Sequence, residues 1–233
     1  MSREEFVYID MIALDADDTL WENEPFFKES EKQFCQLLDK YGSQDEISQL
    51  LLQIEKEHLP TFGYGVKAFT LSMIETATRI SNHQVTGQEI QEIIRLGAQQ
   101  VHQPVHLLEN VELVVQYLKD KYQLVCITKG NLLEQELKVE KSGIKHHFES
   151  IHIVSEKNPD QYKHILDNKQ VNPDSFMMIG NSMKSDILPV LELGAHAIHI
   201  PFHTTWEHEI VNEKVIHPKL RTCGEIKELL NIL

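Results

Sequence analysis

Five short, mainly apolar runs, separated by segments with helical patterns, constrain the fold of this chain more than any other feature. A short run that is apolar throughout is typical of a strand buried on both faces of a parallel sheet. Strands that alternate with helices indicate a doubly wound α/β architecture, because a parallel neighbour is reached through a helical crossover. The five predicted strands are residues 11–14, 124–127, 150–154, 176–179 and 195–200.

The stretch between the first two strands contains helical patterns only. Helix starts are marked by a Ser or Thr followed three residues later by Glu, because the two side chains can cap the first turn together. Such pairs stand at Ser43–Glu46 and Thr86–Glu89, and a third at Thr222–Glu225 predicts a final helix. The pattern predicts an all-helical insertion in an otherwise α/β chain.

The length agrees with one large domain that carries this insertion. A domain typically has about 150 residues, and the chain has 233. We expect a catalytic core formed by residues 1–21 and 106–233, and a helical cap domain formed by residues 22–105.

Composition limits the partners of the protein. There are 22 Lys and Arg against 36 Asp and Glu, a formal net charge of −14, which disfavours binding to nucleic acids or anionic membranes. No run approaches the roughly 20 apolar residues of a transmembrane helix, and residues 1–5 are polar, unlike a signal peptide. Three scattered cysteines predict buried thiols in a reducing cytoplasm. The sequence does not predict an oligomeric state.

Polar residues follow four of the predicted strands, at the edge of a parallel sheet where ligands bind. Each of them alone has an ordinary explanation as a turn, a helix cap or a solvated side chain. The ordered set instead supplies the parts of one mechanism from four strand ends. It consists of Asp15, Asp17 and Thr19, then Thr128, then Lys157, and finally Gly180, Asn181 and Asp186.

The acidic residues of this set favour a cation. Side chains two residues apart on a strand point the same way, so we expect Asp15 and Asp17 to face one site together with Asp186. Two carboxylates about 5 Å apart repel by roughly 3 kcal/mol at an effective dielectric of about 20. A hard, oxygen-liganded ion such as Mg²⁺ suits such a cluster. With Lys157 and Thr128 as donors, the set predicts a cradle for a phosphoryl group that one carboxylate attacks while another transfers protons.

These residues resemble the motifs of the haloacid dehalogenase-like hydrolase superfamily, which consists mostly of Mg²⁺-dependent phosphatases. The resemblance covers nearly the whole chain and implies a Rossmann-like doubly wound parallel sheet with a helical cap of the family's first type. The matching segments are residues 12–20 (IALDADDTL), 125–128 (VCIT), 155–157 (SEK) and 180–186 (GNSMKSD).

The resemblance also implies a role for each motif residue. Asp15 would be the nucleophile that takes the phosphoryl group, and Asp17 would protonate the leaving oxygen and then activate water. Mg²⁺ would be held by Asp15, the backbone carbonyl of Asp17 and Asp186, with the Asn181 amide on the metal or its water; Thr128 and Lys157 would hold phosphoryl oxygens. Because true haloacid dehalogenases lack the second carboxylate, Asp17 favours hydrolysis at phosphorus over displacement at carbon.

Three positions depart from the family pattern. Asp18 stands where Gly is usual, Asn181 where Asp is commoner, and Lys129 where Asn is common. The change to Asn181 removes one negative charge, so we expect weaker metal binding.

Substrate choice is expected to come from the cap and from the loops around the site. The candidate substrate-binding residues are Thr19, Lys129 and Gly130 in the core, and Tyr64 and Lys67 beside a glycine turn of the cap. We expect a small, soluble phosphate ester as substrate. The alternatives are another phosphoryl-transfer enzyme of the family, such as a phosphomutase, or a non-catalytic protein that binds phosphoryl groups or signals through them.

Overall fold

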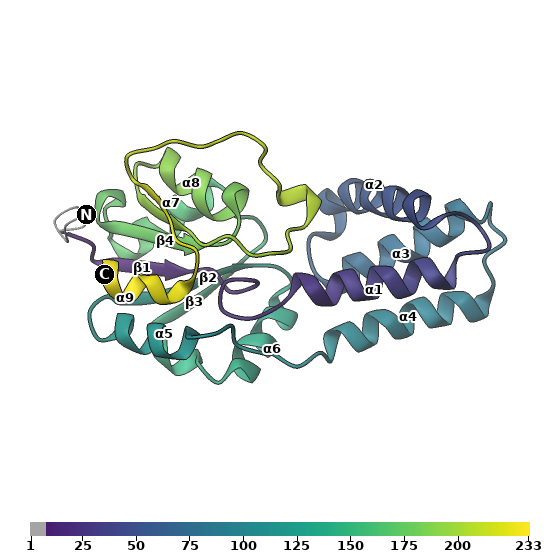
Figure 1. The fold of residues 1–233 in the computed structure, drawn as a ribbon, viewed down its shortest axis with the longest axis horizontal. Helices are drawn as coiled ribbons and strands as arrows, with labels where there is room; N and C mark the ends of the chain where they lie inside the picture. Colours follow the sequence, from purple (N-terminus) through teal and green to yellow (C-terminus); the bar gives the residue numbers. More distant parts are fainter. Residues whose placement is uncertain (1–7) are drawn as a thin grey trace. The chain divides into compact units, whose positions relative to one another are not determined.

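The computed structural model describes residues 8–233, and the chain divides into two compact units. We call Met1–Glu22 with Val105–Leu233 the sheet unit, and Asn23–Pro104 the helical unit. Figure 1 shows the elements of both. The polar residues 1–5, on which the expectation about a signal peptide depends, lie outside the described residues. The cap function of the helical unit stays a prediction.

The sheet unit is built on a parallel sheet of six strands in the order β3-β2-β1-β4-β5-β6. The chain runs outward from β1 through β2 to β3, and then returns to the other side of β1 with β4. Open α/β sheets bind their ligands at the carboxyl ends of the strands, next to such a reversal of direction. The strands are β1 (Met11–Leu14), β2 (Gln123–Lys129), β3 (Ser150–Val154), β4 (Phe176–Gly180), β5 (His196–His199) and β6 (Leu220–Thr222).

Both faces of the sheet are covered, which confirms the Rossmann-like doubly wound fold. In the central strand β1, Ile12 and Leu14 belong to one buried cluster and Met11 and Ala13 to another. The first cluster includes side chains of α5 (Val111–Lys119), α6 (Leu132–Ser142) and α9 (Leu229–Ile232), and the second those of α7 (Pro159–Lys169) and α8 (Leu188–Glu192). The alternation explains why the strand is apolar throughout, since neither of its faces meets water.

The sixth strand and the end of the chain correct the sequence prediction. Thr222 does not cap a helix: it ends β6 and pairs with His199 of β5. The cap lies one turn later, where Glu225 and Glu228 form the reciprocal pair. The pairs 222/225 and 225/228 have the same spacing of three residues, so spacing alone does not separate them. The strand β6 is too short and too exposed to be recognised as an apolar run. The helix expected from about Ser185 likewise begins earlier, as a π-helical turn at Met183–Ile187.

The helical unit contains α1 (Glu24–Leu37), α2 (Gln44–Phe62), α3 (Val66–Ile80) and α4 (Gly87–Val101). Its core includes Phe34 and Phe69, as expected for aromatic residues at helical spacing. The capping boxes predicted at Ser43 and Thr86 are both confirmed. In the second capping box, the carboxylate of Glu89 accepts hydrogen bonds from Lys40 and from Thr86. These contacts, that of Lys40 above all, lower the pKa of Glu89 to about 2.

Two further expectations concern the whole chain. Cys35, Cys126 and Cys223 are buried and unpaired with one another, as predicted. Within residues 8–233, no helix is long and apolar enough to cross a bilayer.

Candidate active site

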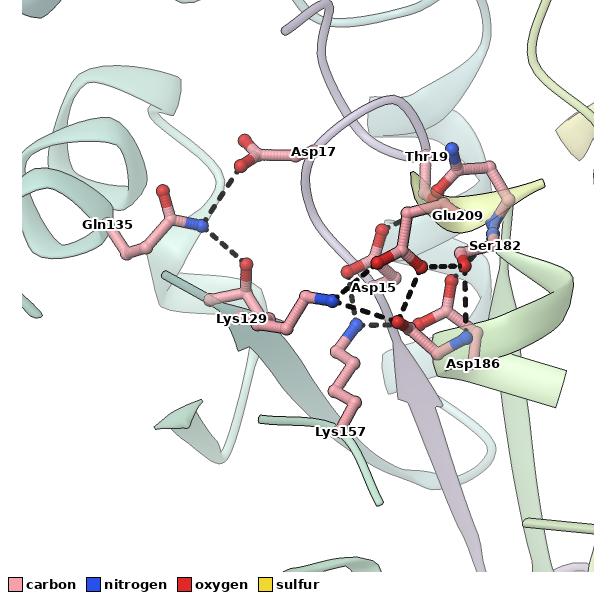
Figure 2. A network of polar contacts seen from close by, with 12 residues as sticks. Asp15, Asp17, Thr19, Lys129, Gln135, Lys157, Ser182, Asp186 and Glu209 are labelled. Atoms are coloured by element: carbon pink, nitrogen blue, oxygen red, sulfur yellow. Dashed lines mark hydrogen bonds and ion pairs between the residues drawn. The ribbon is translucent and has the colours of Figure 1, made fainter. Parts of the chain in front are cut away.

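Three charged side chains meet at the carboxyl edge of the sheet. Asp15 follows β1 directly, Lys157 lies between β3 and α7, and Asp186 lies on the π-helical turn after β4. The ammonium of Lys157 donates to Asp15 Oδ1 and, at 2.6 Å, to Asp186 Oδ1 (Figure 2). All three are at most 6% exposed. The convergence agrees with the expectation drawn from the strand ends.

This triad carries more negative than positive charge. The pKa of Asp15 is raised to about 7, chiefly by burial and next by the charge of Asp186, while Lys157 acts in the opposite direction. Burial alone would lower the pKa of Lys157, but the carboxylates of Asp15 and Asp186 hold it well above its ordinary value. Two buried carboxylates that share one ammonium favour a further cation nearby.

The oxygen atoms around the triad suit Mg²⁺, which commonly takes one or two carboxylates and leaves its other positions to water and substrate. The hydroxyl of Thr19 lies 3.1 Å from Asp15 Oδ2 and 3.2 Å from the amide oxygen of Asn181, so these two oxygens share a neighbour. Among residues 8–233, no group of three His, Cys, Asp or Glu side chains is arranged to hold a metal. A site here would therefore combine carboxylates with neutral oxygens.

Thr19 joins two loops of the site. Besides these two contacts, its hydroxyl accepts the backbone N–H of Asn181 at 3.1 Å, and the residue is only 3% exposed. Its hydroxyl connects the loop after β1 with the loop after β4, and its role in substrate binding stays a prediction.

Gly180 is required by the close approach of Asp186. A Cβ atom on Gly180 would lie 2.3 Å from Asp186 Oδ2 and 2.4 Å from Asp186 Cγ. The same Oδ2 accepts the backbone N–H of Ser182 at 2.9 Å. The glycine thus leaves room for the carboxylate to lie against the end of β4.

Asp17 corrects the expectation that it faces the same site as Asp15. Its carboxylate is turned toward α6, where it accepts Lys138 Nζ at 2.9 Å and Gln135 Nε2 at 3.2 Å, and it also accepts Trp21 Nε1 at 2.7 Å. Figure 2 shows Asp17 apart from the triad. The period of two holds only for an extended chain.

The backbone after β1 is a tight turn instead of an extended strand. The carbonyl of Ala16 accepts the N–H groups of Thr19 and Leu20. Asp18 has φ 62°, a left-handed conformation that favours glycine and that Asp tolerates better than most residues. The turn explains why glycine would suit position 18, and why Asp17 points elsewhere than Asp15.

Thr128 and Asp17 are linked through Gln135. The Nε2 of Gln135 donates to Asp17 (Figure 2) and lies 2.5 Å from the hydroxyl of Thr128. A single amide therefore connects the end of β2 with the loop after β1. Thr128 is buried. Beside it, Gly130 has φ 153°, and a Cβ there would lie 3.0 Å from Gln135 Cγ.

Lys129 meets a carboxylate that the sequence analysis did not single out. Its ammonium lies 2.7 Å from Glu209 Oε1 and 2.9 Å from Ser185 Oγ, with Glu156 at 3.5 Å. No local pattern indicates this contact, because Glu209 is 80 residues away along the chain. Gln135 and Lys138 were also missed, although their spacing of three places them on one side of α6.

The two candidate residues of the helical unit stand beside a glycine turn. Gly63 has φ 67° and Gly65 has φ 107°, so both positions between α2 and α3 favour glycine. Tyr64 lies between them and Lys67 is in the first turn of α3. Their role in substrate binding stays a prediction.

Comparison with known proteins gives a family and a fold. The model of the haloacid dehalogenase-like hydrolases matches residues 9–194. A structure of a haloacid dehalogenase-like family hydrolase from Xanthomonas campestris is 34% identical, with TM-score 0.86 over 98% of this chain and 91% of that one. A comparison with curated proteins gives no match.

Two more distant structures share the fold but differ in the activity that their names state. A predicted phosphoglycolate phosphatase from Haemophilus somnus has 16% identity and TM-score 0.66, over 100% of this chain and 99% of that one. A 2-haloacid dehalogenase from Pseudomonas syringae pv. Tomato has 18% identity and TM-score 0.64, over 96% and 97%. Fold alone therefore does not choose between phosphate esters and haloacids.

Proposed function

This chain belongs to the haloacid dehalogenase-like hydrolase family, and we propose that it is a Mg²⁺-dependent phosphomonoester hydrolase acting on a small, soluble phosphate ester. The observation that carries the proposal is the pair of buried carboxylates, Asp15 and Asp186, that share the ammonium of Lys157. This arrangement suits a nucleophile beside a cation site. Asp17 adds the second carboxylate that phosphoryl chemistry needs for proton transfer.

We propose that Asp15, Asp186, the Asn181 amide and the backbone carbonyl of Asp17 hold the Mg²⁺ ion. When bound, the ion would offset the charge of the phosphoryl oxygens and make the phosphorus easier to attack. Lys157 supplies a second, permanent positive charge next to the nucleophile. Its two carboxylate contacts fix the position of that charge before substrate enters.

The proposed reaction has two steps at phosphorus. In the first, a carboxylate oxygen of Asp15 attacks, the bond from phosphorus to the leaving oxygen breaks, and Asp17 gives that oxygen a proton. In the second, Asp17 takes a proton from water, the water oxygen attacks phosphorus, and the bond to Asp15 breaks to release phosphate. Thr128 and Lys157 hold the phosphoryl oxygens in both steps.

Asp17 has to exchange a contact to take part. In the structure its carboxylate is the acceptor in the contacts with Trp21, Gln135 and Lys138. We propose that the reacting oxygen or water replaces one of these donors during turnover. Gln135 is the nearest to the reaction, because it also touches Thr128.

The test is release of phosphate from p-nitrophenyl phosphate and from a panel of metabolite phosphates, with Mg²⁺ and with EDTA. Wild type is compared with Asp15→Asn and with the matched control Asp39→Asn, which changes an exposed aspartate of the helical unit. A parallel assay measures halide release from 2-haloacids. We expect phosphate release that requires Mg²⁺ and Asp15 and is unaffected in Asp39→Asn.

Other outcomes point to the alternatives. Halide release without Mg²⁺ would assign the chain to the dehalogenases, and conversion of a phosphate into its isomer would indicate a phosphomutase. No turnover on the whole panel, with no rise in melting temperature on adding Mg²⁺, would refute the proposal and favour a non-catalytic binding role. The three buried, free cysteines support a reducing cytoplasmic setting for the enzyme.

A further inference from the structure

A π-helical turn presents Asp186 to the site. Met183–Ile187 follows β4 after a short loop and has the wide π geometry, which is rare and is found mostly as single turns at functional sites. The side chain of Ser182 caps the turn by accepting the N–H of Ser185 at 3.0 Å. A conformation this uncommon needs contacts from outside the turn to hold it.

Two of these contacts come from Glu209, which lies in a short 3₁₀ turn, Glu207–Glu209, between β5 and β6. Glu209 Oε2 accepts the hydroxyls of Ser182 and Ser185, each at 2.6 Å, and Oε1 accepts Lys129 Nζ at 2.7 Å. Figure 2 shows Glu209 beside Ser182. We call Glu209, Lys129, Ser182 and Ser185 the Glu209 cluster.

The hydrogen atoms of the Glu209 cluster have one consistent arrangement. Each serine hydroxyl donates its single proton to Glu209, which leaves its oxygen free to accept. Ser182 Oγ then accepts the N–H of Ser185, and Ser185 Oγ accepts Lys129 Nζ at 2.9 Å. A carboxylate is needed at the centre, because an amide has only one accepting oxygen.

The Glu209 cluster is nearly closed to water. The side chains of Glu209 and Lys129 are 11% and 13% exposed. Burial would raise the pKa of Glu209, but Lys129 and the two serines lower it to about 2. The carboxylate is therefore ionised at neutral pH, and it offsets the charge of Lys129 within the cluster.

The cluster is connected to Asp186 through Ser182. The hydroxyl of Ser182 donates to Glu209, while its backbone N–H donates to Asp186 Oδ2 and its carbonyl accepts the backbone N–H of Asp186, both at 2.9 Å. From these contacts we infer that Glu209 is a positioning residue, which holds the π-helical turn so that Asp186 and Asn181 are ready for Mg²⁺. Lys129 belongs to this anchor and not to the substrate contacts.

The inference rests on the proposed function only where it concerns Mg²⁺ binding. One of its two measurements is therefore made on the metal-free protein. Hydrogen exchange of the metal-free protein, followed by mass spectrometry, reports on peptides that cover residues 180–187. Calorimetric titration with Mg²⁺ then reports the dissociation constant. The variants are Glu209→Gln, which keeps the size but exchanges one accepting oxygen for a donor, and Glu209→Asp, which keeps the charge. Glu207→Gln, at an exposed position in the same 3₁₀ turn, is the matched control.

We expect Glu209→Gln to speed exchange at residues 183–187 and to weaken Mg²⁺ binding, each by about tenfold, which corresponds to about 1.4 kcal/mol. Glu209→Asp should recover part of both effects, and Glu207→Gln should match wild type. If Glu209→Gln does not fold, Lys129→Met tests the same anchor from its other side, with the same two changes expected.

Two results would overturn the inference. Faster exchange confined to residues 201–210, with residues 183–187 and the Mg²⁺ affinity unchanged, would mean that Glu209 only fastens its own loop. An unchanged exchange pattern throughout would mean that the cluster does not hold the turn. Failure of the wild type to bind Mg²⁺ would instead count against the proposed metal, and the exchange data would still decide whether Glu209 holds the turn.

Discussion

Gly180→Ala is the most direct test of how tightly the site is built. The backbone of Gly180 lies outside the left-handed range that penalises other residues, so alanine can adopt it. At such a position, replacing Gly by Ala ordinarily stabilises a protein by about 0.4–1 kcal/mol, because it restricts the unfolded chain. Any loss of stability must then come from what the added methyl group meets.

That methyl group would meet Asp186. Its carbon would lie 2.3 Å from Oδ2, whereas ordinary contacts begin at 3.4 Å, so the carboxylate has to withdraw by about 1 Å. This withdrawal weakens the bonds to Lys157 (2.6 Å) and to the backbone N–H of Ser182 (2.9 Å). Hydrogen bonds to charged groups contribute about 1.5–3 kcal/mol each. Because each of these two hydrogen bonds would be weakened and not lost, we expect the free energy of unfolding to fall by about 2–4 kcal/mol.

The effect on activity should be larger than the effect on folding. A displacement of about 1 Å in a catalytic group can cost about 100-fold in rate, so we expect kcat/KM for p-nitrophenyl phosphate to fall by roughly that factor. Urea unfolding and initial rates at saturating Mg²⁺ measure the two quantities. Gly87→Ala is the matched control, because its Cβ meets nothing within 4 Å. A Gly180→Ala protein as stable and as active as wild type would refute the placement of Asp186 against β4.

Three further predictions address other parts of the molecule. Gly97→Ala in α4 should lower the free energy of unfolding by about 1–3 kcal/mol, because its Cβ would lie 2.1 Å from Thr70 Oγ1; adding Thr70→Ala should restore most of the loss in urea unfolding. Asp17→Asn should lower kcat by about 100-fold or more but cost no more than about 1 kcal/mol of stability, since its ion pair is partly exposed; a variant with normal kcat would exclude Asp17 as the acid. Glu89, whose pKa is lowered to about 2 from 4.5 chiefly by its bond to Lys40, stabilises the fold above pH 4.5, and this contribution disappears as the pH falls toward 2; melting temperatures of wild type and Glu89→Gln should therefore converge over that range, and a constant difference would contradict the assignment.

The parts of the fold that the sequence predicts are those set by local pattern. The fully buried strands β1 and β4 are apolar throughout, and β2, β3 and β5 are apolar enough to be predicted. The strand β6 was missed because Leu220–Thr222 has only three residues, of which one is apolar. The capping boxes at Ser43 and Thr86 were predicted correctly, because each has a single candidate pair. Near the end of the chain two pairs have the right spacing, and the prediction chose Thr222 where the structure has Glu225.

The parts of the site that the sequence predicts are those set by topology. Asp15, Lys157 and Asp186 meet because the carboxyl ends of parallel strands share one edge. The direction of the Asp17 side chain depends on a turn that contains a left-handed residue and on donors from α6. The alternation of side chains along a strand predicts neither of them. The contact between Lys129 and Glu209 joins two segments that have no pattern in common, so only the three-dimensional structure reveals it.

The strand order has a consequence for synthesis on the ribosome. The central strand β1 emerges before its two neighbours in the sheet, β2 and β4, and the last of these ends at Gly180. The four helices of the helical unit, by contrast, form their apolar cluster within residues 23–104, so this cluster needs no later part of the chain. We therefore expect the helical unit of the nascent chain to be folded while the apolar segment of β1 is not yet paired with β2 and β4. During that interval, β1 is the segment that a chaperone would have to shield.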